Sequence, residues 1–430
     1  MNNPSASSAA ASKVKARPSL TVAIGSTVAR QIFASALYFV SLWITTRTLG
    51  PQQNGVLTTL MLLPQTLFAF LNLGIGPSNV YHLSSGKGDH TRMRVTNWCL
   101  AVGLWIVIAV VLLISSNHLI GRVLPGIDKN AALLASLLFP MLLLAAWSSA
   151  LIQGQRDYRT YNLTLLIQPV VFCISILLLR AADMITPVAV VCCTIVSQCS
   201  LWLSSERRIG RFETSTSAHY RLSGVLFFGL CAHLSNVITF LNYRLALYLV
   251  SVMLGATAVG KYALSVQLAE VFWLVSGAAA MIVFPESAAK ERTPAQLQKM
   301  IDQVALVVVL VTGGGALLAG FLASTAIPWV FGEDYAGSVT PFLILLPGVV
   351  LWSYMSVIAN SLAGMGFQGV NIWGALLCLG INICGDLLAI PRWGMQGAAM
   401  ASSIAFSCTA LYTVFADKKI MNKRVQAGHV

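Results

Sequence analysis

The chain has 430 residues, of which 57% are hydrophobic and only 10% charged, and its formal net charge at pH 7 is +13. Its mean hydropathy of +0.77 excludes a soluble domain, because so few polar residues cannot cover a surface exposed to water. We therefore expect an all-α polytopic membrane protein.

Twelve apolar runs are long enough to cross ~30 Å of hydrocarbon as helices, so about twelve transmembrane spans are expected. They lie at residues 20–46, 56–81, 97–115, 131–153, 161–179, 184–203, 222–252, 256–284, 301–330, 339–363, 370–390 and 394–416. Residues 1–18, rich in Ser, Ala and Asn, are expected to form a disordered tail, and residues 417–430 a basic tail.

Lysine and arginine residues divide unequally between the two sides of this arrangement. Nineteen lie on the side of the two termini and six on the other side, and Arg30 and Arg244 lie inside spans. Positively charged loops stay cytoplasmic, so both termini are predicted to be cytoplasmic. Topology thus explains the net charge without a nucleic-acid partner, although basic loops also contact anionic membrane lipid.

A short pattern occurs twice, 205 positions apart: LGPQQNG at residues 49–55 and LGATAVG at 254–260 share L-G-x4-G between apolar runs. Duplication of one unit explains it most simply. We expect an N-terminal six-helix bundle (19–203), a cytoplasmic linker (204–221) and a C-terminal six-helix bundle (222–416). Paired halves in membrane transporters usually alternate access to a central substrate site.

Polar side chains that cannot avoid the bilayer form the candidate site. A charge in hydrocarbon costs about 2.5–3.5 kcal/mol on insertion scales, so it is expected to face water or a partner. On the first, second, seventh and eighth expected helices, polar residues share one face at helical spacing. The expected cavity residues are Arg30, Gln31, Gln65, Asn72, His233, Asn236, Tyr243, Arg244 and Glu270.

The repeat offset aligns Gln65 with Glu270, whereas neither arginine has a charged counterpart. Glu270 is expected to pair with an arginine or to take up a proton. Asp386 lies four residues before the end of a span, where hydration at the outer interface allows either proton coupling or a structural role. An alternative for the uncharged residues and His233 is that they only hydrogen-bond helices together. The nine cysteines lie in apolar runs, so no metal site is expected.

Four stretches resemble the polysaccharide transporters of the multidrug/oligosaccharidyl-lipid/polysaccharide (MOP) exporter superfamily. They are RTLGPQQNGV at residues 47–56, LGATAVGKYALS at 254–265, FGEDY at 331–335 leading into LILLPG at 343–348, and NICGDLLAIPRWGMQGAAMA at 382–401. Their order and spacing extend the resemblance over nearly the whole chain.

This resemblance implies a V-shaped, MATE-like pair of six-helix bundles with a cavity between the first, second, seventh and eighth helices. It implies a Wzx-type flippase rather than an enzyme, which moves undecaprenyl-diphosphate-linked oligosaccharides across the bacterial inner membrane. A polymerase and a chain-length regulator are the implied partners. Transport of this kind needs no cofactor, and coupling to a proton or sodium gradient is expected.

Three alternatives remain from the sequence. A multidrug cation extruder of the same superfamily would have an acidic cavity with few buried arginines. A peptidoglycan-precursor flippase would have two additional helices. A membrane glycan polymerase or ligase would carry paired carboxylates in large outer loops, for which the short connections leave no room.

Overall fold

The computed structural model describes residues 20–84, 89–115, 121, 124, 126–155, 158–209, 222–288 and 293–427. The expected tail at 1–18 and most of the linker at 204–221 lie outside these residues. The first half contains α1 (Leu20–Leu71), α2 (Ile75–Ser84), α3 (His90–Ile114), α5 (Lys129–Ser136), α6 (Leu138–Gly154), α7 (Tyr158–Ala181) and α8 (Pro187–Ile209). The second half contains α9 (Leu222–Leu254), α10 (Ala256–Glu270), α11 (Trp273–Ala288), α12 (Pro294–Phe331), the short 3₁₀ helix η1 (Glu333–Ser338), α13 (Val339–Gly364) and α14 (Gln368–Ala427).

Two of these helices are long enough to cross the membrane twice. α1 has 52 residues and α14 has 60, whereas about 20 residues at ~1.5 Å each cross the hydrocarbon. Each contains a glycine with positive φ at which the chain changes direction, Gly50 (φ 67°) in α1 and Gly394 (φ 57°) in α14. Ten described helices are long and apolar enough to cross a membrane. If α1 and α14 each cross it twice, on either side of the break, these ten helices are compatible with twelve spans.

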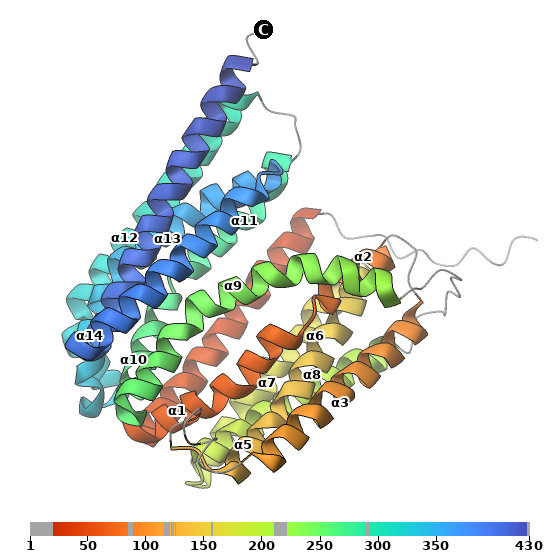
Figure 1. Cartoon of the computed structure of the whole chain (residues 1–430), viewed down its shortest axis with the longest axis vertical. Helices are drawn as coiled ribbons and strands as arrows, with labels where there is room; N and C mark the ends of the chain where they lie inside the picture. The colour runs from red at the N-terminus through yellow and green to blue at the C-terminus, as the bar shows by residue number, and fades with distance from the viewer. Residues whose placement is uncertain are drawn as a thin grey trace, which may run out of the picture.

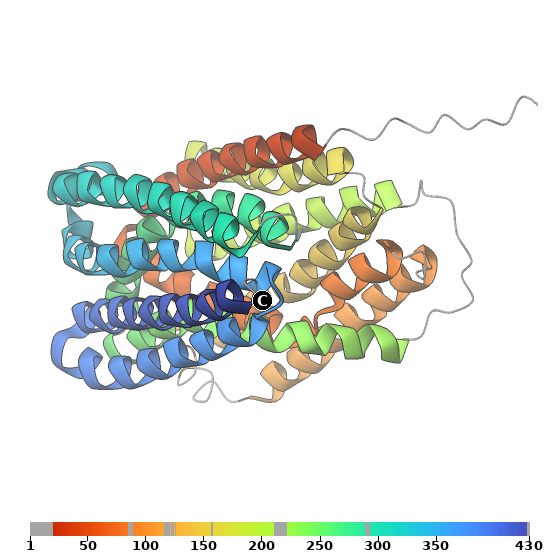
Figure 2. The same cartoon turned by 90° about the horizontal axis from the view of Figure 1, so that it is seen from above.

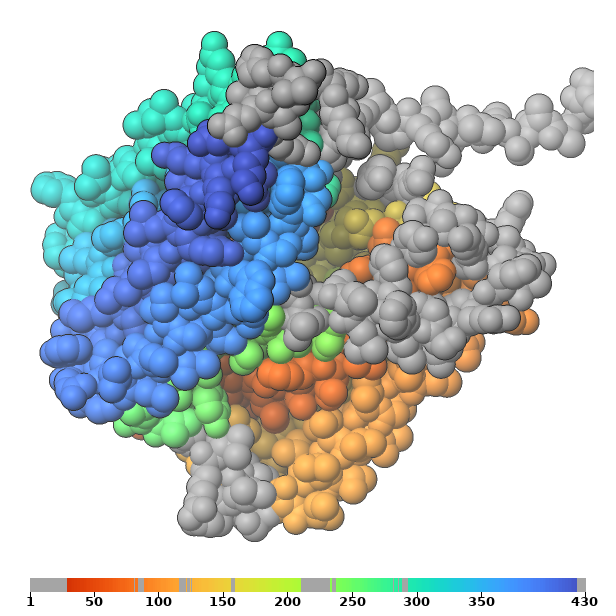
Figure 3. Space-filling model, turned by 45° about the horizontal axis from the view of Figure 1, so that its top comes forward, coloured from red at the N-terminus to blue at the C-terminus, as the bar shows by residue number. Residues whose placement is uncertain are grey.

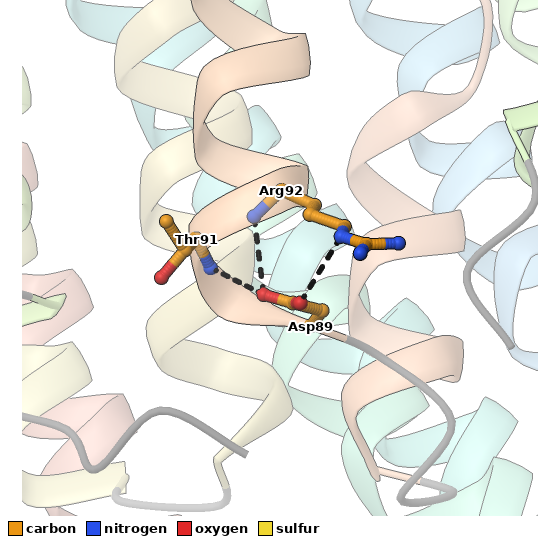
Figure 4. Close-up of polar contacts among 3 residues, drawn as sticks. All are labelled: Asp89, Thr91 and Arg92. Carbon is orange, nitrogen blue, oxygen red and sulfur yellow. Dashed lines mark hydrogen bonds and ion pairs between the residues drawn. The ribbon is translucent and has the colours of Figure 1, made fainter. Parts of the chain in front are cut away.

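Polar capping places the start of α3 earlier than its apolar run predicts. α3 begins at His90 rather than at residue 97. The Asp89 carboxylate oxygen Oδ1 accepts hydrogen bonds from the backbone N–H groups of Thr91 (2.9 Å) and Arg92 (3.1 Å), as Figure 4 shows. The Arg92 Nε atom also lies 3.5 Å from Asp89 Oδ2. A hydropathy window misses this first turn because the capping residues are polar.

The helices form two bundles (Figures 1 and 2). In the N-terminal bundle, α1, α2, α3, α6 and α8 pack around buried Phe139 and Trp147, and in the C-terminal bundle α10 to α14 pack around buried Tyr262 and Tyr335. α9 packs on α10 and α14 but also contacts α1 and α2, so it lies along the boundary between the bundles. The bundles meet near the break in α1 and the start of α10, and they diverge towards the start of α1 and the end of α14 (Figure 1). The result is the expected V shape.

The closed end of the V is formed by the two L-G-x4-G turns, which contact one another. A Cβ atom at Gly55 would lie 1.7 Å from the carbonyl oxygen of Ala256, and one at Gly260 would lie 2.0 Å from that of Pro51. The Asn54 Nδ2 atom donates a hydrogen bond to the Gly260 carbonyl oxygen (3.4 Å). The last glycine of each turn is therefore required for the backbones to approach so closely.

Hydrogen bonds to backbone carbonyls extend this contact between the bundles. The Arg47 Nη1 atom donates to the carbonyl oxygens of Trp329 and Val330, both at 2.8 Å, and Trp43 Nε1 donates to that of Val330 (2.9 Å). In the opposite direction, the Tyr335 hydroxyl donates to the Thr46 carbonyl oxygen (3.2 Å). Arg47 thereby satisfies carbonyl groups at the C-terminal end of α12, where a positive charge is favourable.

We expect Gly260→Val to push the two turns apart and to destabilise the protein by at least ~1–3 kcal/mol, because the added carbons meet backbone atoms that cannot move aside. Gly103→Val in α3 is a matched control, since a Cβ atom at Gly103 meets nothing within 4 Å. Thermal unfolding of the purified protein in detergent measures both. Equal losses of stability in the two variants would show that the contact at Gly260 imposes no constraint.

Candidate functional site

A cavity of about 440 Å³ lies between the two bundles, and we call it the central cavity. In Figure 3, seen from the open side of the V, the C-terminal bundle in cyan and blue lies on one side and the orange part of the N-terminal bundle on the other. Residues from α1 and α7 to α11 line the cavity. Its polar side chains are Ser35, Tyr38, Ser41, Thr45, Thr46, Asn54, Thr58, Gln65, Thr194, Arg244, Gln267 and Glu270.

An ion pair lies in the wall of this cavity. The Arg244 Nη1 atom is 3.1 Å from Glu270 Oε1, and the two side chains are 29% and 24% exposed. Each charge on its own would be costly inside a membrane span, and pairing beside a polar cavity reduces that cost. The pair also leaves the cavity wall close to neutral, since Arg244 and Glu270 are its charged lining residues within the described part of the chain.

The helix that carries Glu270 is interrupted directly after it. α10 ends at Glu270 and α11 begins at Trp273, so the expected span at 256–284 is broken within the membrane. Among the described residues, neither the Gln267 Oε1 atom nor the Trp273 Nε1 atom has a hydrogen-bond partner, although both are buried. Broken helices with free polar groups are typical of substrate and ion sites in transporters.

A second cavity of about 410 Å³ lies between α1 and α11, and we call it the side opening. Gln31 and Ser35 of α1 line it on one side, and Glu270 and Leu274 on the other. It shares Ser35, Glu270 and Leu274 with the central cavity. The two spaces are therefore neighbours, and Glu270 faces both of them.

The expected cavity residues are only partly brought together. Gln65, Arg244 and Glu270 line the central cavity and Gln31 lines the side opening, whereas the side chain of Asn236 lies outside the described part. Asn72 instead accepts a hydrogen bond from Trp147 Nε1 (2.7 Å) within the N-terminal bundle. The remaining three residues, His233, Tyr243 and Arg30, also have other surroundings.

His233 and Tyr243 make packing contacts. The His233 Nε2 atom is 2.8 Å from the Phe70 carbonyl oxygen, which joins α9 to α1 across the boundary between the bundles. The Tyr243 ring lies 4.8 Å from the Trp273 ring, in an aromatic cluster of the C-terminal bundle. For His233, the hydrogen bond between helices that the sequence left open as an alternative is the contact observed.

Arg30 is not close to Arg244 in the cavity wall. It lies between α1 and α7, in a separate groove that also contains Arg159 and Asn162. Its helical position alone suggested that Arg30 lies deep in the span. Because its neighbour Arg159 is the second residue of α7, Arg30 instead lies near the membrane edge. The expectation that both arginines face one cavity is wrong for this conformation.

The expected hydration of Asp386 is also wrong. Its side chain is 0% exposed, and neither carboxylate oxygen has a hydrogen-bond partner among the described residues. The chain reverses at Gly394, and the second half of α14 packs closely on the first half: a Cβ atom at Gly397 would lie 2.3 Å from the Ala389 carbonyl oxygen, and one at Gly385, next to Asp386, would lie 2.8 Å from Ala401 Cβ. Asp386 is thus a carboxylate enclosed in the C-terminal bundle.

Comparison with known proteins identifies the family. A family profile described as "Polysaccharide biosynthesis protein" matches residues 44–340, which is more than half of the chain. The chain belongs to the polysaccharide biosynthesis protein family. This match confirms the resemblance to polysaccharide transporters that the four sequence stretches indicated. No curated protein matches the sequence at a significant level.

Solved structures of MOP-superfamily proteins share the fold. The lipid II flippase MurJ in an inward closed conformation has a TM-score of 0.72 and 16% identity, over 91% of this chain and 90% of that one. An inward-facing MATE family multidrug resistance transporter has a TM-score of 0.73 and 14% identity, over 91% and 95%. A MOP superfamily transporter from Pyrococcus furiosus has a TM-score of 0.68 and 12% identity, over 94% and 95%. The expected MOP-type fold is confirmed.

This polysaccharide biosynthesis family protein also has cavity residues that the sequence analysis did not select. Gln267 lies three residues before Glu270, on the same face of α10, so helical spacing could have identified it. Tyr38 also lines the cavity, where its hydroxyl donates to Gln168 Oε1 and its ring lies 6.2 Å from that of Phe172. Nothing in the sequence indicates that α7 packs there, so Gln168 and Phe172 could not have been predicted.

In this family member we expect the Arg244–Glu270 pair to stabilise the fold by about 1–2 kcal/mol as measured by a double-mutant cycle. Arg244→Met and Glu270→Met each leave one unpaired charge, so each single variant should unfold at a lower temperature than the double variant. Thermal unfolding in detergent checks this. Additive losses in the double variant would show that the two side chains do not interact.

Proposed function

We propose that this protein is a flippase that moves a polyprenyl-diphosphate-linked oligosaccharide from the cytoplasmic to the periplasmic leaflet of the bacterial inner membrane. One observation carries the proposal: a cavity lined by many polar side chains and one ion pair lies where the two bundles meet, and an opening on its side leads out between α1 and α11. Such a space accommodates a polar headgroup while an attached hydrocarbon chain stays in lipid. Family membership and the shared fold with a lipid II flippase support it.

The orientation follows from the basic loops, which favour cytoplasmic termini. The open side of the V then faces the cytoplasm and the contact between the two L-G-x4-G turns closes the periplasmic end. In this inward-open state a headgroup made in the cytoplasm has access to the central cavity. Transport requires Gly55 and Gly260 to separate as the bundles rock about the cavity.

The cavity wall offers two kinds of contact to a lipid-linked glycan. Hydroxyl and amide groups such as those of Thr58, Gln65 and Gln267 suit sugar hydroxyls, and the Tyr38 and Phe172 rings offer flat surfaces. One guanidinium N–H group of Arg244 donates to Glu270. The remaining N–H groups are donors that a diphosphate can accept from. The apolar wall of the side opening suits the polyprenyl chain.

Coupling to an ion gradient is assigned to Asp386, with Glu270 as the partner of Arg244. A buried carboxylate without a hydrogen-bond partner is costly inside a membrane span. Uptake of a proton or a sodium ion would remove that cost. Because the neighbouring Gly385 contacts Ala401 in the second half of α14, occupancy of Asp386 can influence how the two halves pack and hence the position of the C-terminal bundle.

We expect Arg244→Gln to lower glycan export by about 10–100-fold, which corresponds to the ~1.5–3 kcal/mol of a charge-assisted hydrogen bond. Arg244→Lys should have an intermediate effect, because lysine keeps the charge but loses the planar donor group. Surface glycan in cells that depend on this gene, normalised to protein level in the membrane, is the measurement. Arg392→Gln is the control, since exposed Arg392 donates to Leu388 of its own helix.

Normal export by Arg244→Gln at an unchanged protein level would contradict the assignment of the cavity. Transport of cationic dyes without any export of glycan would favour a multidrug extruder of the same superfamily instead. Arg30→Gln is expected to affect export less than Arg244→Gln, because Arg30 does not line the central cavity.

We expect Asp386→Asn to abolish the stimulation of transport by an imposed ion gradient, because the amide cannot bind and release the ion. Asp386→Glu should retain it in part. Transport into proteoliposomes, with a proton or a sodium gradient applied separately, also identifies the ion. Asp302→Asn is the control, because Asp302 is exposed at the start of α12 and accepts a hydrogen bond from Gln298 (2.8 Å). Full stimulation in Asp386→Asn would assign coupling to another group.

A further inference from the structure

The groove between α1 and α7 is a second polar site, separate from the central cavity. Its volume is about 410 Å³, and it is lined by Ala29, Arg30 and Phe33 of α1 and by Arg159, Asn162, Leu163 and Leu166 of α7. None of these residues lines the central cavity. The α7 residues follow the spacing i, i+3, i+4 and i+7, so they share one face of that helix.

Positive charge in this groove is not matched by a carboxylate in the described part of the chain. The Arg30 Nη2 atom donates only to the neighbouring Gln31 Oε1 (3.1 Å), and its buried Nε atom has no hydrogen-bond partner there. The four ion pairs among the described residues include neither Arg30 nor Arg159. Arg208 adds a third cation beside the first turn of α7, where it donates to the Thr160 carbonyl oxygen (3.3 Å).

The nearest carboxylate on α8 is already occupied. Glu206 lies two residues before Arg208, but its Oε2 atom pairs with Arg94, and its Oε1 atom accepts hydrogen bonds from Ser148 (2.7 Å) and Trp98 (3.2 Å). These contacts hold the Glu206 side chain inside the N-terminal bundle, where it is 8% exposed. It therefore does not neutralise the arginines of the groove.

The groove changes from charged to apolar along the helices. α1 and α7 both run from the side of the basic loops into the membrane, so Arg30 and Arg159 lie at the membrane edge and Phe33, Leu163 and Leu166 lie deeper. Phe33 is 51% exposed and Leu163 is 50% exposed, which turns them towards the surrounding lipid. A phosphate at the edge followed by a hydrocarbon chain matches this order.

We propose that the α1–α7 groove binds one anionic phospholipid of the cytoplasmic leaflet, with its phosphate between Arg30 and Arg159 and an acyl chain along Phe33, Leu163 and Leu166. Basic residues that only set topology need no cavity and can be fully hydrated. Here the Arg30 Nε atom is buried in the groove without a partner, which leaves a donor for a phosphate oxygen.

A resident phospholipid fits this groove better than the transported lipid does. A substrate headgroup has to reach the central cavity, but the hydrogen bond from Tyr38 to Gln168 and the packing of Tyr38 on Phe172 close the path between α1 and α7. The occupied groove would instead hold α1 in place. Gln31 accepts the hydrogen bond from Arg30 and lines the side opening, so the lipid would steady the helix beside that opening.

Native mass spectrometry of the full chain in detergent tests this, with phosphatidylglycerol and phosphatidylcholine of equal chain length as probes. We expect the Arg30→Gln/Arg159→Gln variant to bind phosphatidylglycerol roughly 30-fold more weakly than the wild type, since each basic residue near the surface contributes ~1 kcal/mol and ~1.4 kcal/mol is tenfold. Phosphatidylcholine should bind weakly to both proteins. Arg92→Gln is the matched control, because Arg92 lies on the same side but pairs with Asp89.

Arg159→Gln alone covers the case in which the double variant does not fold, because Arg159 is exposed at the start of α7. This single variant should bind phosphatidylglycerol about fivefold more weakly than the wild type, since one basic residue contributes ~1 kcal/mol. Equal binding of phosphatidylglycerol by wild type and variants, or equal binding of the two lipids, would overturn the proposal. The proposal would also be overturned if undecaprenyl diphosphate displaced phosphatidylglycerol at a concentration below that of phosphatidylglycerol and if its own binding required both arginines. That last result would reassign the groove to the transported lipid.

Discussion

The close approach of two glycine turns is the contact on which the architecture depends. Because Gly55 and Gly260 lack a Cβ atom, the backbones of the two halves meet at one end of the molecule. Two rigid bundles joined closely at one end must diverge at the other, and this divergence creates the central cavity and the side opening. The repeated motif is therefore a packing surface in both copies, and the duplication supplies the two sides of one contact.

Polar groups then collect where the bundles separate. Inside a bundle, each polar group needs a protein partner, as Asn72 has in Trp147. Along the boundary, the cavity leaves the Arg244–Glu270 pair partly exposed, and next to the interruption after Glu270 the described part of the chain offers no hydrogen-bond partner to Gln267 Oε1 or Trp273 Nε1. The neutral balance of this wall distinguishes it from the groove at Arg30, where positive charge remains unpaired in the described part of the chain.

Hydropathy and motif order predict the fold well because both depend on local sequence. The spans, the V shape and the family follow from them, and the expected residues Gln65, Arg244 and Glu270 do line one cavity. Helical spacing gives the face of a helix but not the neighbour that covers it. For this reason the surroundings of Arg30 were predicted wrongly, and those of Asp386 as well, since the chain reversal at Gly394 packs the second half of α14 on the first.

The hydrogen bonds of Arg47 and Trp43 have an evolutionary consequence. Their acceptors are backbone carbonyl oxygens at positions 329 and 330, and every amino acid supplies such an oxygen. The C-terminal side of this contact can therefore drift in sequence without compensating changes in the N-terminal half. Pairs of positions across this contact should show little covariation among homologues. A chimera that joins the N-terminal half of one homologue to the C-terminal half of another should still form the contact between the bundles.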